Sequence, residues 1–73
     1  MIVYGLACAA VCDVILRETG QEVTEFTPIE SLDVDSLELL DLLMEIERET
    51  GIAVPDARIA ELQTVGDIVK VAA

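Results

Sequence analysis

The feature that most constrains the fold of this chain is the spacing of apolar residues between Ser36 and Gly51. At about 100° per residue, a helix over 36–50 carries two apolar stripes on nearly opposite sides. The wider stripe is formed by Leu39, Leu42, Leu43 and Ile46, and the narrower one by Leu37, Leu40 and Met44. A helix on the outside of a small bundle needs only one apolar face. The pattern therefore predicts that the wider stripe faces a core and that the narrower one is exposed.

The rest of the chain also favours helices. A first helix is predicted over 2–18, with Thr19-Gly20 as its stop signal, and a second over 36–50 that ends at Gly51. Residues 20–35 contain Pro28 and no sustained helical period, which indicates a long ordered loop.

The last third of the chain predicts two further helices. Asp56 follows Pro55 and can cap a short third helix that reaches about Leu62. Thr64 and Asp67 have the spacing of a capping box, which predicts a fourth helix to the C-terminus. No stretch shows strand alternation. The expectation is one domain, residues 1–73, that is all-α: a small four-helix bundle with three main helices and a short third.

The composition limits what such a bundle can bind. With 73 residues, it buries only about 60–65% of its unfolded surface. Fifteen acids against four bases give a net charge of −11, which repels nucleic acid and anionic membranes and attracts basic protein surfaces. Eight of these acids lie between Glu30 and Glu49, with Arg48 as the one base among them.

Several other classes of protein are excluded. The chain has no histidine, so it lacks the base of a serine or cysteine hydrolase, and no enzyme activity is expected. Cys8 and Cys12, without histidine, fall short of a zinc site and are predicted to be packing residues in a reducing compartment. Asp33-Val34-Asp35 begins like a calcium loop, but the later positions do not fit. No metal site is expected.

The uncharged run 2–12 imitates the core of a signal peptide, but it lacks a basic flank, and Asp13 interrupts it. It is also too short to cross a bilayer. We therefore expect a cytoplasmic protein with no membrane insertion.

Ser36 stands where the second helix begins. Serine is a preferred N-cap residue, although Asp35 could serve equally well. Capping alone would explain the serine, but it does not explain an exposed apolar stripe that starts one residue later. A phosphate esterified to this hydroxyl would lie where free backbone N–H groups and the helix dipole favour an anion.

At this point the sequence resembles the acyl carrier proteins. Residues 32–37 (Leu-Asp-Val-Asp-Ser-Leu) are similar to the attachment motif of that family, and 38–47 to its recognition helix. Residues 51–56 (Gly-Ile-Ala-Val-Pro-Asp) resemble the entry into its third helix, and 64–67 (Thr-Val-Gly-Asp) the start of its fourth.

The resemblance implies a function for each part. Ser36 would receive 4′-phosphopantetheine from coenzyme A through a phosphopantetheinyl transferase, and the arm would hold acyl groups as thioesters. Acyl-transfer and chain-elongation enzymes with basic docking surfaces would be the partners. The partner-binding residues would be Asp35, Leu37, Glu38, Leu40, Asp41, Met44, Glu47 and Val54. The residues around the acyl chain would be Leu42, Ile46, Ile59 and Leu62, with Val54 beside them.

Three departures from the family stand out. Asp33 replaces a glycine that many members carry, and Arg48 occupies a helix position that is often acidic in the family, which locally inverts the partner-facing charge. The first helix has a core face of Val3, Ala7, Ala10 or Val11, and Val14. It has a second apolar line on its outer side, formed by Gly5, Ala9, Cys12 and Leu16. The small residues of this line would allow another helix to approach closely. A monomer with weak self-association through the first helix is therefore expected.

Two alternatives stay open. Fatty-acyl, polyketide, aminoacyl and D-alanyl carriers share the same apparatus, and the strong acidity favours fatty-acid or polyketide synthesis. An unmodified acidic helical adaptor would present a similar second helix to a basic groove. The adaptor would tolerate loss of the Ser36 hydroxyl, and a carrier would not.

Overall fold

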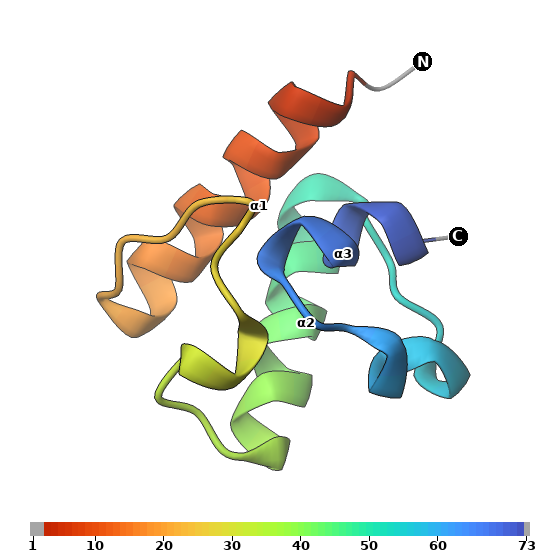
Figure 1. The fold of residues 1–73 in the computed structure, drawn as a ribbon. Coiled ribbons are helices and arrows are strands. Elements are labelled where there is room, and N and C mark those ends of the chain that lie inside the picture. Colours follow the sequence, from red (N-terminus) through yellow and green to blue (C-terminus); the bar gives the residue numbers. More distant parts are fainter. Residues whose placement is uncertain (1–2, 73) are drawn as a thin grey trace.

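Three α-helices enclose one core in the structure, a computed structural model that describes residues 3–72. They are α1 (Tyr4–Thr19), α2 (Ser36–Thr50) and α3 (Val65–Val71), and α1 packs against both of the others (Figure 1). Two short 3₁₀ helices, η1 (Ile29–Ser31) and η2 (Asp56–Glu61), lie in the connections. The all-α bundle is thereby confirmed. The short third helix is present as η2, which is 3₁₀ rather than α-helical.

The helix boundaries follow the predicted signals closely. Gly20 and Gly51 end α1 and α2 in the left-handed conformation, with φ of 76° and 77°, which glycine adopts without steric cost. The predicted start of the first helix at residue 2 lies outside the described residues. At the start of α3, the Asp67 carboxylate accepts hydrogen bonds from the backbone N–H of Thr64 (3.0 Å) and Gln63 (2.9 Å), as the capping-box spacing predicts.

Each α-helix contributes fully buried side chains to the core: Val11 and Ile15 from α1, Ile46 from α2, and Val65 and Ile68 from α3. The wider stripe of α2 therefore faces inward as expected, with Leu42 and Leu43 also buried and Leu39 packed against the core.

The core face of α1 was predicted only in part. Ala7, Val11 and Val14 are buried as expected, but Val3 is 58% exposed because it precedes the first helical turn. Cys8 is buried instead, since the core-facing side of the helix is centred between Ala7 and Cys8 at that level.

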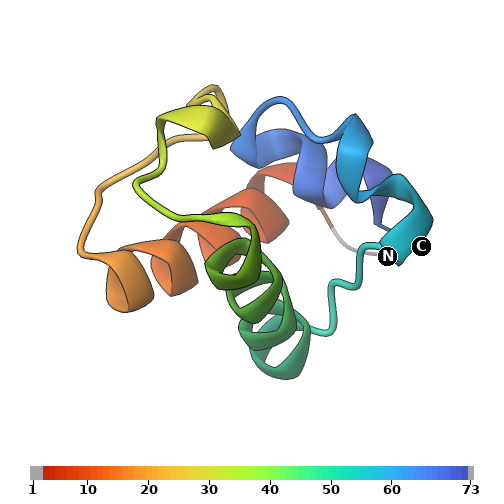
Figure 2. The same ribbon diagram turned by 90° about the horizontal axis from the view of Figure 1, so that it is seen from below.

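The long loop between α1 and α2 is fastened to the start of α3. Backbone hydrogen bonds join Ile29 N–H to Gln63 O (2.8 Å), Val65 N–H to Thr27 O (2.9 Å) and Gly66 N–H to Glu25 O (2.8 Å). Figure 2 shows η1 beside the beginning of α3. The loop also buries Ile29 and Leu32 in the core. These contacts fix the direction from which the chain enters α2.

Candidate functional site

The first turn of α2 is held by a capping box. The Asp35 carboxylate accepts a hydrogen bond from the Glu38 backbone N–H (2.8 Å), and the Glu38 carboxylate accepts one from the Asp35 N–H (3.2 Å). Two backbone donors that the helix cannot satisfy are thus paired reciprocally. Asp35, not Ser36, is therefore the N-cap residue.

Ser36 is the first residue of α2, and its side chain is exposed. Because Asp35 supplies the cap, the Ser36 hydroxyl is not needed to hold the helix. Ser31, the other serine of the chain, differs in this respect: its hydroxyl donates to the carbonyl of Pro28 at 2.7 Å. The geometry thus presents one serine hydroxyl, at a helix start, to solvent.

The narrower stripe of α2 is exposed, as predicted. Leu37 is 74% exposed, Leu40 41% and Met44 67%, and we call these three residues the docking stripe. Leucine and methionine side chains exposed together beside carboxylates are typical of an interaction site rather than of a surface that only meets water. Leu37 begins this stripe one residue after Ser36, so the serine and the stripe form one continuous surface.

Charges around the docking stripe differ between its two ends. Near Ser36 the carboxylates of Asp35, Glu38 and Asp41 are exposed, without a base beside them in the described part of the chain. Near the other end, Arg48 donates to both carboxylate oxygens of Glu45 (2.6 and 2.5 Å). These bonds hold the pKa of Glu45 below its ordinary value, and they raise the pKa of Arg48. The unusual Arg48 therefore neutralises a neighbour as well as altering the surface.

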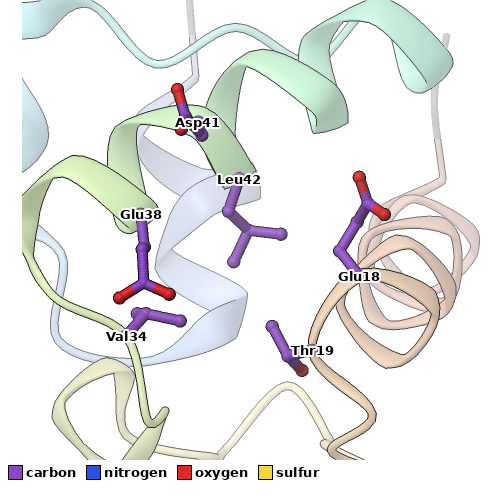
Figure 3. Close-up of a pocket in the computed structure, with 6 residues that line it drawn as sticks. All are labelled: Glu18, Thr19, Val34, Glu38, Asp41 and Leu42. Carbon is purple, nitrogen blue, oxygen red and sulfur yellow. The ribbon is translucent and has the colours of Figure 1, made fainter.

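The four predicted acyl-contacting residues lie in two environments. Leu42 and Ile46 are buried, whereas Ile59 and Leu62 are half-buried and pack against the core from η2 and the residue that follows it. Val54 is half-buried in the same way. Leu42 also lines a pocket of about 230 Å³ on the α1 side of α2, apart from η2 (Figure 3).

This pocket contains residues that the sequence did not single out. Figure 3 shows Glu18 and Thr19 from the end of α1 opposite Glu38, Asp41 and Leu42 from α2, with Val34 below them. Glu18 and Thr19 are fifteen or more residues away in sequence from the other lining residues. No local pattern could have predicted that they meet; only the crossing of α1 and α2 brings them together.

The two cysteines have the character of packing residues. Cys8 is buried and Cys12 half-buried, and both are free thiols. Burial raises the pKa of both thiols, which lowers their reactivity as nucleophiles. Within residues 3–72, no three side chains of the metal-binding types are grouped closely enough to hold an ion. None of the helices described is long and apolar enough to cross a membrane.

The start of α2 thus combines an exposed serine after an N-cap aspartate with an acidic helix and an exposed apolar stripe. The chain belongs to the family described as "Phosphopantetheine attachment site", whose model matches residues 8–72. Members of this family carry a covalently attached phosphopantetheine.

Three named relatives are similar in sequence to this chain. The chain is 37% identical over 65 residues to the meromycolate extension acyl carrier protein of Mycobacterium tuberculosis (strain ATCC 25618 / H37Rv), covering 84% of this chain and 56% of the relative. It is 38% identical over 72 residues to the protein of that name from Mycolicibacterium aurum, covering 93% and 69%. It is 40% identical over 67 residues to the acyl carrier protein of Rhodococcus erythropolis (strain PR4 / NBRC 100887), covering 75% and 74%. The chain thus spans little more than half the length of the first of these relatives.

Proposed function

We propose that this chain is an acyl carrier, with a 4′-phosphopantetheine arm on Ser36. The terminal thiol of the arm would hold an acyl group as a thioester and pass it between enzymes of fatty-acid or polyketide synthesis. The observation that carries the proposal is the division of roles at the start of α2. Asp35 caps the helix, so the exposed Ser36 hydroxyl has no structural task.

The surroundings of Ser36 suit a phosphodiester on its oxygen. The first N–H groups of an α-helix have no partner within the helix, and the Asp35 carboxylate takes only that of Glu38. The N–H groups of Ser36 and Leu37 are then left to face an anion, and the helix dipole adds to their attraction. The chain itself supplies the anchor and the docking surface, and the reactions belong to its partners.

The partners would be a phosphopantetheinyl transferase and the acyl-transfer and chain-elongation enzymes. We propose that their basic side chains meet Asp35, Glu38, Asp41 and Glu47, while the docking stripe and Val54 make the apolar contacts. Attraction between exposed charges of opposite sign is screened by salt. Binding of these enzymes should therefore weaken as ionic strength rises.

For the cargo we propose a fatty-acid-type acyl chain rather than an aminoacyl group. The names of the relatives, which refer to acyl carriers and to meromycolate extension, favour this class. The chain would be sheltered among Leu42, Ile46, Ile59 and Leu62, all of which lie in or against the core. Movement of η2, which has no fully buried side chain, would make room for it.

The proposal is tested by intact-mass measurement after incubation with coenzyme A and a broad-specificity phosphopantetheinyl transferase. We expect a gain of one phosphopantetheine in the wild type and in Ser31→Ala, and no gain in Ser36→Ala. Ser31→Ala is the matched control because it removes the only other serine. A wild type that gains no mass would instead support the unmodified adaptor, and a gain that persists in Ser36→Ala would place the arm elsewhere.

A further inference from the structure

The outer side of α1 carries an apolar surface that includes none of the residues assigned above to the carrier function. Residues 3–12 contain no charged side chain. Their inward side fills the core, yet Val3 and Leu6 are 58% and 71% exposed, and Gly5 and Ala9 are exposed as well. We call these four residues the α1 patch. It shares no residue with the docking stripe on α2.

A shallow groove of about 240 Å³ runs along one edge of the α1 patch, between α1 and the end of α2. It is lined by Leu6, Ala7, Ala10, Glu49, Thr50 and Ile52. Leu6 therefore stands as a ridge beside a mostly apolar groove. In a twofold interface the same surface meets itself, so a ridge beside a groove is self-complementary: the leucine of each copy can enter the groove of the other.

We propose that the α1 patch is a contact surface between two copies of this chain. The argument for a second copy, and against a basic enzyme, is one of charge. Each copy carries a net charge of −11, so approach through most of its surface sets carboxylates against carboxylates. The four residues of the α1 patch carry no charge, and the nearest acid on the same helix is Asp13, one turn beyond Ala9. Glu49, which lines the groove, forms an ion pair with Arg17, which reduces the repulsion there.

The small area of the α1 patch predicts a weak contact between the two copies. A stable interface buries about 800 Å² per partner, roughly a sixth of the 4697 Å² that the described chain exposes. One helix face with two large exposed side chains supplies less than this. The dimer should therefore form only at high protein concentration. It should become stronger with added salt, which screens the repulsion between the two acidic copies. Docking of a basic enzyme has the opposite salt dependence.

Sedimentation velocity tests the proposal, with reducing agent present to exclude disulfide-linked species. Protein at about 0.01–1 mM is compared in low salt and in moderate salt. Exposed charges repel one another over a longer distance in low salt, and moderate salt screens this repulsion. We expect a reversible monomer–dimer equilibrium whose dissociation constant falls with salt. Leu6→Glu should raise the dissociation constant at least about tenfold, since it places a charge at the centre of the patch. Ala9→Glu should do the same.

Two controls keep the test specific. Leu37→Glu changes a leucine of almost equal exposure on the docking stripe and should leave the dimer intact. Ser36→Ala should also leave it intact, so that the dimer and the carrier function can fail separately. Thermal melts check that each variant is folded. A strict monomer at the highest concentration in moderate salt would overturn the proposal, as would a dimer that Leu37→Glu abolishes and Leu6→Glu does not. Loss of enzyme binding in Leu6→Glu without any dimer would assign the patch to an enzyme instead.

Discussion

The capping box at the start of α2 predicts that Asp35 stabilises the fold and that Ser36 does not. Asp35→Ala removes the acceptor, at 2.8 Å, of the Glu38 backbone N–H, and it leaves only the other half of the box, the bond from the backbone N–H of residue 35 to the Glu38 carboxylate. Replacing an N-cap aspartate by alanine costs about 0.5–2 kcal/mol. For a chain of this length, 1 kcal/mol corresponds to about 4–8 °C in melting temperature, so we expect a fall on the order of 5–10 °C.

Ser36→Ala should behave differently. It removes no hydrogen bond that holds the helix, and alanine is a better helix former than serine by a few tenths of a kcal/mol. Its melting temperature should stay within about 2 °C of the wild type. Far-ultraviolet circular dichroism melts of the two variants measure both effects. A fall in Ser36→Ala as large as that in Asp35→Ala would show that the serine is structural, and would refute the division of roles.

Three further predictions concern stability. Gly66→Ala should destabilise the fold by about 1–3 kcal/mol, because a Cβ there would lie 2.5 Å from the Tyr4 hydroxyl and 3.0 Å from a backbone carbonyl oxygen. Gly5→Ala has open space around it and should stabilise the fold by about 0.5–1 kcal/mol. Equal melting temperatures for the two would contradict this. The backbone N–H groups of Thr64 and Gln63 hold the pKa of Asp67 below its ordinary value of 3.8. The ionised carboxylate therefore stabilises the fold above pH 3.8, and this stabilisation is lost as the pH falls through the lowered pKa. The difference in melting temperature between wild type and Asp67→Asn should therefore be constant from about pH 5 to 7 and shrink below about pH 4; a constant difference at pH 3 would be inconsistent. Salt or millimolar divalent cation should raise the melting temperature at pH 7, since the net charge is −11, and an unchanged melt would count against charge repulsion.

Much of the fold could be predicted because it depends on local patterns. The two stripes of α2 follow directly from helical spacing, and the structure leaves Leu37, Leu40 and Met44 exposed as expected. The stops at Gly20 and Gly51 follow from the same kind of rule, because a left-handed residue is needed where each helix ends.

The sequence could not predict what depends on contacts between distant segments. Residues 56–61 form a 3₁₀ helix without a buried side chain, and no local signal in the sequence distinguishes it from a short α-helix. The backbone bonds that fasten the loop near Ile29 to Gln63 leave no side-chain pattern to detect. Helical spacing predicts Cys12 on the outer line of α1, but in the structure it is half-buried and packs against the core, because the loop near Val23 lies against that side of the helix.

The central claim is that the arm on Ser36 gives this chain an accessible, reactive thiol, which neither of its own two cysteines provides. The burial of Cys8 and the half-burial of Cys12, with the raised pKa of each, predict that both react slowly with a thiol reagent in the folded protein. A count of fast-reacting thiols at neutral pH, before and after treatment with coenzyme A and a phosphopantetheinyl transferase, tests this directly. We predict a gain of one fast-reacting thiol per chain in the wild type and none in Ser36→Ala. No gain in the wild type, or the same gain in both, would contradict the account.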